Sequence, residues 1–185
     1  MRFDPKAYGS YVAQILALDQ GGHRLIPLVS GVCSSEAARS RLKNHKACDL
    51  FPNANAPEAA LGGMWLYFSC FDEGHEIVQD LASVEGSFWH AILHRQEPDA
   101  GNSAYWFRRV GQPRLFAELN RESGEILSRY PEAGFRIGDE WDPFSFIDFC
   151  EKARQQPKPQ PERAALEIQR MEWQLLFDYC ARSKE

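Results

Sequence analysis

The chain has 185 residues, of which 44% are hydrophobic and 12% aromatic; this is the composition of a folded protein and excludes disorder over most of its length. Its 21 basic and 26 acidic residues give a net charge of -5 without a block of basic residues, so we expect no nucleic-acid partner. The N-terminus lacks a signal-peptide pattern, and the longest apolar run, 64–68, is too short to cross a bilayer. We therefore expect a cytoplasmic protein that does not associate with membranes.

Cysteine usage supports the same compartment. The five cysteines are odd in number, widely spaced and contain no C-x-x-C pair: Cys33, Cys48, Cys70, Cys150 and Cys180. Small secreted domains and structural zinc sites have closer, paired spacings. We therefore expect neither a disulfide framework nor a thiolate zinc site, and a reducing environment.

Glycine and proline divide the first part of the chain into three predicted helices. A Gly-Gly pair ends the first helix, and a Ser-Ser-Glu triplet supplies an N-cap and an acidic first turn for the second. Pro57 suits the first turn of the third helix. The three predicted helices cover 8–18, 36–50 and 58–81.

The central part of the chain contains the clearest helix boundaries. Ser83 is a good N-cap for a helix over 84–96, which Pro98 ends, and Asp99 can cap the helix that follows. That next helix is expected to end near Gly111. Because the connection is short, the two helices are predicted to fold back on each other.

Beyond residue 113 the pattern predicts three more helices. They cover 114–128, with an interruption or an end at Ser123-Gly124, then 142–155 and 162–182. A loop over 130–140 contains a weak strand signal at 135–137, and Asp142-Pro143 is a typical helix start. Residues 155–161 are rich in proline and form a semi-rigid linker.

The last predicted helix has one buried stripe, so it should dock onto the body of the protein or exchange between protomers of a homodimer. Its stripe consists of Leu166, Gln169, Trp173, Leu176, Phe177 and Cys180. The whole chain, 1–185, is therefore predicted to be a single all-α domain. We expect six to seven helices arranged around a central antiparallel hairpin of 58–81 and 84–96.

Three polar side chains share one face of the otherwise apolar helix 84–96. His90, His94 and Glu97 follow the i, i+4, i+7 spacing, which points side chains in the same direction because successive residues are about 100° apart. On the preceding helix, Asp72 and His75 lie in a stripe that turns polar toward its end. An antiparallel arrangement would bring the two stripes together.

Two imidazoles at i and i+4 can ligate one zinc ion, with a third ligand from a facing helix. We therefore predict His75, His90, His94 and Asp72 as ligands of a divalent metal such as zinc. Glu97 is predicted as a ligand or general base, and Arg95 as a substrate anchor, for hydrolysis of a small-molecule ligand.

Two other interpretations stay open. Buried histidines more often pair with carboxylates or backbone carbonyls than bind metal, so the cluster also fits a structural polar network or a metal-free site. In the first case the protein would be a non-enzymatic helical interaction module.

Gly74, inside a predicted helix, costs roughly 1 kcal/mol relative to alanine, which suggests that two helices approach each other closely there.

The string G-x-x-W-H-x3-H-R-x-E-x-D-x2-N-x2-Y-W-F-R-R, at 86–109, resembles the signature of an uncharacterised bacterial protein family. The stretches 71–76 and 172–177 are also similar to parts of that family. The resemblance implies no particular activity and supports only the choice of region. More loosely, the hairpin around Pro98 resembles one tetratricopeptide or Sel1-type repeat, although no second copy follows.

Overall fold

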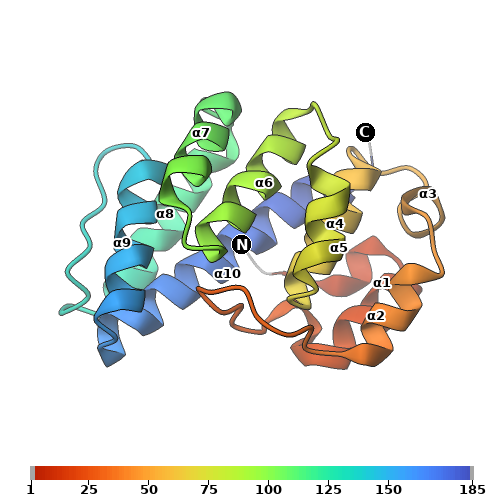
Figure 1. The fold of residues 1–185 in the computed structure, drawn as a ribbon, viewed down its shortest axis with the longest axis horizontal. Coiled ribbons are helices and arrows are strands. Elements are labelled where there is room, and N and C mark those ends of the chain that lie inside the picture. The colour runs from red at the N-terminus through yellow and green to blue at the C-terminus, as the bar shows by residue number, and fades with distance from the viewer. Residues whose placement is uncertain (1–2, 184–185) are drawn as a thin grey trace.

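The structure, a computed structural model, describes residues 3–183 as ten α-helices and two 3₁₀ helices, with no strand among these residues (Figure 1). The predicted all-α class is confirmed, with more helices than the six or seven expected. In chain order the elements are η1 (Pro5–Tyr8), α1 (Ser10–Leu16), η2 (Ala17–Gly22), α2 (Glu36–Lys43), α3 (Ala47–Leu50), α4 (Pro57–Tyr67), α5 (Phe71–Val78), α6 (Val84–Gln96), α7 (Ala100–Val110), α8 (Leu115–Leu127), α9 (Pro143–Gln155) and α10 (Pro159–Ala181).

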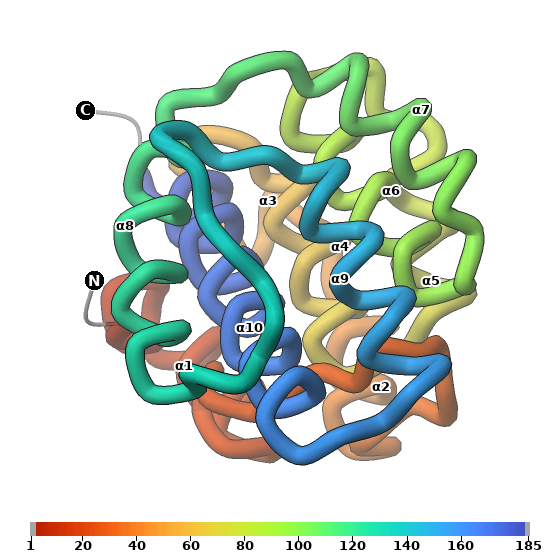
Figure 2. The backbone as a smooth tube through the Cα atoms, turned by 90° about the vertical axis from the view of Figure 1, so that its left-hand side faces the viewer, coloured from red at the N-terminus to blue at the C-terminus, as the bar shows by residue number. Residues whose placement is uncertain are grey.

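Helix α10 runs through the middle of the molecule and packs against α4, α8 and α9 (Figure 2). Most of its side chains beyond Ala164 are buried against the other helices of the chain. The Trp173 indole donates a hydrogen bond to the Gly63 carbonyl over 2.7 Å, and the Gln174 amide donates to the Gly22 carbonyl over 2.8 Å. These contacts join the last helix to the first third of the chain.

The predicted helix starts at Ser83, Asp99 and Asp142 are confirmed. Ser83, Asp99 and Asp142 each accept a hydrogen bond from a backbone N–H in the first turn of α6, α7 and α9. Such caps satisfy donors that have no partner within the helix. Helix α7 ends before Gly111, whose φ of 70° is rarely adopted by other residues.

The predicted helix over 58–81 is wrong in one respect, because it is broken into α4 and α5. At the break Ser69 has a φ of 55°, and its hydroxyl accepts a hydrogen bond from the Arg24 guanidinium over 3.0 Å. Arg24 also donates to the Tyr67 carbonyl. No glycine or proline marks this position, so the chain turns here because of contacts with a distant segment.

The close helix approach expected at Gly74 is confirmed where α5 folds back on α4. A Cβ atom at Gly74 would lie 2.9 Å from Leu66 Cδ1 and 3.4 Å from Trp65 Cβ. The first distance is shorter than van der Waals contact allows, and the second is at the lower end of ordinary contact. A larger residue at this position would therefore require the Leu66 side chain to move.

Other element boundaries also differ from the prediction. The helix expected over 36–50 is divided into α2 and α3, and the one expected over 8–18 is the short α1 between two 3₁₀ helices. Helix α8 continues through Gly124 without interruption, and 135–137 is loop rather than strand. Helix α10 begins at Pro159, because proline is well suited to the first helical position, so the linker is shorter than expected.

Cys33 and Cys70 form a disulfide between the loop that precedes α2 and the residue that precedes α5. The two cysteines are 37 residues apart in sequence, so their spacing gave no sign of the pairing. The chain therefore contains one disulfide, where the cysteine spacing predicted no disulfide framework. Cys48, Cys150 and Cys180 are free.

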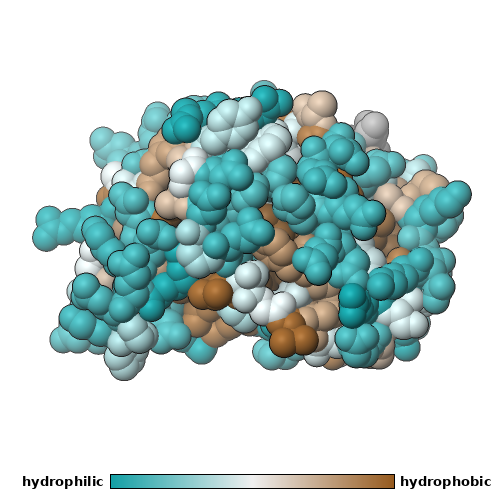
Figure 3. Space-filling view, in the orientation of Figure 1, coloured by the Kyte–Doolittle hydropathy of each residue, from teal (hydrophilic) through white to brown (hydrophobic). Residues whose placement is uncertain are grey.

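The face of the molecule seen in Figure 3 is mainly hydrophilic, with hydrophobic residues in small separate patches. This agrees with a core that gathers around α10. None of the helices in the described part of the chain combines the length and the apolar character needed to cross a membrane.

Candidate metal centre

Helix α6 forms the platform of the site. All its residues from Gly86 to Gln96 are buried, including both histidines: His90 is 5% exposed and His94 is 6% exposed. The two imidazoles lie one helical turn apart on the same side, as their i, i+4 spacing predicted. The sequence therefore places two nitrogen donors on one side of a buried helix.

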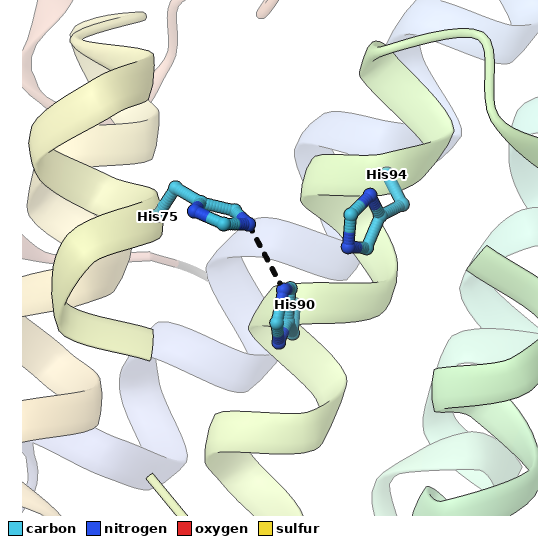
Figure 4. Close-up of side chains that lie close together, drawn as sticks. All are labelled: His75, His90 and His94. Carbon is cyan, nitrogen blue, oxygen red and sulfur yellow. Dashed lines mark hydrogen bonds between the residues drawn. The ribbon is translucent and has the colours of Figure 1, made fainter. Parts of the chain in front are cut away.

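Helix α5 brings a third imidazole to this platform. His75 Nε2 lies 3.1 Å from His90 Nε2, and the rings of His90 and His94 stack with centroids 4.7 Å apart. One nitrogen from each of the three rings lies within 4.8 Å of the other two. Figure 4 shows the three rings converging from the two helices. This confirms the expected convergence of His75 with His90 and His94.

The distances fit a common metal ion closely. Two nitrogens bound to one tetrahedral zinc ion, each at 2.0–2.1 Å, are about 3.3 Å apart. The His75 and His90 nitrogens already have nearly this separation, at 3.1 Å. A side-chain adjustment of up to about 1.5 Å would bring the third nitrogen to the same distance.

Electrostatics keep His90 in the form that a metal requires. Burial, with repulsion from His94 and His75, lowers the pKa of His90 to about 4. The ring is therefore neutral at pH 7, with a lone pair free on one nitrogen. Its Nδ1 atom is buried and has no hydrogen-bond partner among the described residues.

His94 is oriented by two polar neighbours. Its Nδ1 lies 2.8 Å from Glu97 Oε2, so it donates to the carboxylate and leaves the lone pair on Nε2. The Asn102 amide nitrogen lies 3.1 Å from that Nε2. A carboxylate that holds the outer nitrogen of an imidazole is the usual support of a metal-binding histidine. Glu97 is thus placed to orient the His94 ring, and its role as ligand or general base stays a prediction.

Helix α7 contributes residues that the sequence analysis did not assign to the site. Trp106 stacks on His90 with ring centroids 4.0 Å apart, and Asn102 contacts His94. The hairpin turns at Pro98, so residues at equal distances before and after it face each other. This register was a signal in the sequence that could have identified both residues.

Two residues predicted for the site lie elsewhere. Asp72 is exposed in the first turn of α5, and its carboxylate does not join the three converging imidazoles. The Arg95 guanidinium is 1% exposed and paired with the Glu172 carboxylate of α10, with a further bond to Gln169. Because its charge is neutralised inside the core, Arg95 is not available as a substrate anchor. This geometry corrects both assignments.

Comparison with known proteins finds no matching family model, no similar curated protein and no similar solved structure. The geometry of the three histidines and their neighbours therefore carries the functional argument.

Proposed function

We propose that this protein binds one divalent transition-metal ion, with zinc the best fit, through His75, His90 and His94. The observation that carries the proposal is the convergence of three imidazole nitrogens within 4.8 Å, two of them 3.1 Å apart. Like metal-bound imidazoles, the ring of His90 is held neutral by its surroundings. The Glu97 carboxylate contacts Nδ1 of His94 and orients that ring, as carboxylates commonly do for metal-binding histidines.

The proposed chemistry is hydrolysis of a small molecule. Three imidazole ligands would leave the fourth position of a tetrahedral ion open, as in catalytic zinc sites. A zinc ion held there would lower the pKa of a bound water toward 7 and so supply a nucleophile at neutral pH. We also propose the cytoplasm of a bacterium as the location, from the resemblance of 86–109 to a bacterial family and from the sparse cysteines.

A second proposal is a non-enzymatic helical module in which the cluster is a polar network. It is favoured by one observation: the histidines already have partners without a metal. His75 lies within hydrogen-bond distance of His90, and the Asn102 amide can donate to His94. In that case the three rings would serve only to join α5, α6 and α7.

Zinc binding by the purified untagged protein separates the two proposals. For the metal site we expect one zinc per chain by elemental analysis. The double variant His90→Gln with His94→Gln should lose zinc, with affinity reduced by about a hundredfold or more. Its helical circular dichroism signal should be retained.

The variant His23→Gln is the matched control, because His23 is exposed and lies outside the cluster. It should bind zinc as the wild type does. If the wild type takes up no zinc, iron, nickel or manganese and the double variant loses its fold, the cluster is a structural network.

A further inference from the structure

The loop over 23–35, between η2 and α2, contacts both helices that carry the histidines. The Ser30 N–H donates to the Gln96 carbonyl at the end of α6 over 2.7 Å. The Ser34 N–H donates to the Phe68 carbonyl, also over 2.7 Å, and Cys33 is bonded to Cys70 directly before α5. One segment therefore spans from the end of α6 to the beginning of α5.

The first half of this loop is held firmly by the core. Ile26 is buried, and its carbonyl accepts a hydrogen bond from the Gln169 amide of α10 over 2.9 Å. The Arg154 guanidinium of α9 donates both to the Leu28 carbonyl and to the Arg95 carbonyl of α6. This half is thereby fixed relative to α6.

The second half has fewer supports. Gly31 and Val32 are exposed, Val32 to 89%. Beyond them, the disulfide and the hydrogen bond from Ser34 join the loop to the turn before α5. The disulfide is the covalent part of this connection.

Helix α5 is the element whose position matters for the cluster. It supplies one ligand nitrogen, whereas α6 supplies the other two from a stretch, Gly86 to Gln96, that is buried throughout. Glu73 also holds α5 to α2 through ion pairs with Arg39 and Lys43. Since Arg39 is 37% and Lys43 54% exposed, these pairs contribute little to fixing the helix. The disulfide therefore restrains α5 at the end that lies five residues before His75.

The disulfide is open to a small thiol. It lines a surface cavity of about 340 Å³ together with Val32, Arg39 and Phe71. Cys70 is buried and Cys33 is half-buried, so an attacking thiolate would approach the Cys33 sulfur.

We propose that the Cys33–Cys70 disulfide is a reversible redox switch that sets the metal affinity of the histidine cluster. This inference rests on the proposed metal-binding function. Disulfides in a reducing compartment are usually transient and redox-sensing, which fits a single bridge in a chain with few cysteines. When the bridge is intact, α5 is fixed relative to α6 and His75 stays beside His90. When it is reduced, α5 loses this restraint and the three nitrogens are less well preorganised.

The redox step is thiol–disulfide exchange with low-molecular-weight thiols. A thiolate attacks the Cys33 sulfur and forms a mixed disulfide, and Cys70 leaves as a thiolate that takes up a proton. A second thiol attacks the mixed disulfide, which releases Cys33 as a thiol and the reductant as its own disulfide. Two electrons and two protons pass to the protein in total.

The test compares zinc affinity and α5 exchange in the two states. Zinc titration calorimetry is run on the oxidised wild type and on the double variant Cys33→Ser with Cys70→Ser, which mimics the reduced state without adding thiols that bind zinc. We expect zinc binding to be about tenfold weaker in the double variant, the size of a typical coupling between sites. Amide hydrogen exchange over 71–78 should become faster, with or without zinc.

The variant Cys48→Ser removes an exposed free cysteine and is the matched control. It should match the wild type in both measurements. Should the double variant fail to fold, wild type reduced with a phosphine and alkylated gives the same comparison.

The outcomes separate the two proposals. Equal zinc affinity in both states, with unchanged exchange over 71–78, would overturn the switch and leave the metal site standing. Absence of zinc binding in every protein would overturn the metal site and, with it, the switch. Weaker zinc binding that appears only when Cys33 and Cys70 are separated would support both.

Discussion

Glu167 of α10 accepts hydrogen bonds from three side chains although its own side chain is buried. Tyr130 donates over 2.8 Å, Arg129 over 2.6 Å and Arg163 over 3.0 Å. Burial alone raises the pKa of the Glu167 carboxyl. The hydrogen bonds from these three residues lower it by more in total, so the net pKa lies below its ordinary value. The carboxylate thus ties the end of α8 and the following turn to the central helix.

The charge on Glu167 makes stability depend on pH. Because its pKa is lower in the folded than in the unfolded chain, its contribution is present above pH 4.5 and is lost as the pH falls through the folded pKa. We expect Glu167→Gln to lower the free energy of unfolding by about 1–2 kcal/mol at pH 7, since Arg129 and Arg163 are exposed and screened. The difference between variant and wild type should shrink toward pH 3, measured by urea unfolding.

Glu162→Gln removes an exposed carboxylate from the same helix and is the control. It should change stability by less than about 0.5 kcal/mol at either pH. A loss for Glu167→Gln that is as large at pH 3 as at pH 7 would contradict the role assigned to the charge.

At the scale of an element, the turn between α5 and α6 depends on a glycine. A Cβ atom at Gly86 would lie 2.6 Å from the Leu81 carbonyl oxygen and 2.3 Å from Leu81 Cβ. Since the backbone oxygen cannot move aside as a flexible side chain can, only glycine fits here. This close contact allows α5 to fold back and brings His75 toward α6.

Alanine at two helical glycines should therefore have opposite effects. Gly86→Ala is expected to destabilise the protein by about 1–3 kcal/mol, because of overpacking against Leu81. Gly124→Ala, in α8, meets nothing within 4 Å and should stabilise by up to about 1 kcal/mol through helix propensity. Thermal unfolding of both variants checks this, and a stabilising Gly86→Ala would disprove the contact.

At the scale of the whole molecule, α10 is the centre on which the other helices pack. Its buried residues include Trp173 and Phe177, which stack on each other with centroids 4.8 Å apart and contact Phe3 near the start of the chain. Glu172, on the same helix, neutralises the buried Arg95 of α6. Both halves of the chain therefore share one core that the last helix completes.

A chain that ends at Gln155 is accordingly expected not to fold. It lacks α10, leaves Arg95 without its buried carboxylate, and exposes apolar surface of α4, α8 and α9. Circular dichroism should show a large loss of helix, and thermal unfolding should no longer be cooperative. A cooperative transition in the shortened chain would show that α10 is an accessory rather than the centre.

Much of the architecture follows from signals within a few residues of each other. Ser83, Asp99 and Asp142 start helices because their side chains cap the first turn. The i, i+4 spacing places His90 and His94 together whatever the rest of the fold does. The all-α class and the docking of the last helix follow from the same short-range periodicity.

Only the tertiary structure decided which distant groups meet. The chain breaks at Ser69 through a contact with Arg24, Cys33 is bonded to Cys70, and Arg95 is buried against Glu172. In each case the two partners are 37 to 77 positions apart in the sequence. Hydrophobic periodicity is local and carries no information about which faces pack together. The sequence by itself therefore determined the all-α class, several helix starts and the shared side of two nitrogens in the histidine cluster. Packing of α5 against α4 and α6 supplied the third, because that approach depends on close contacts at Gly74 and Gly86.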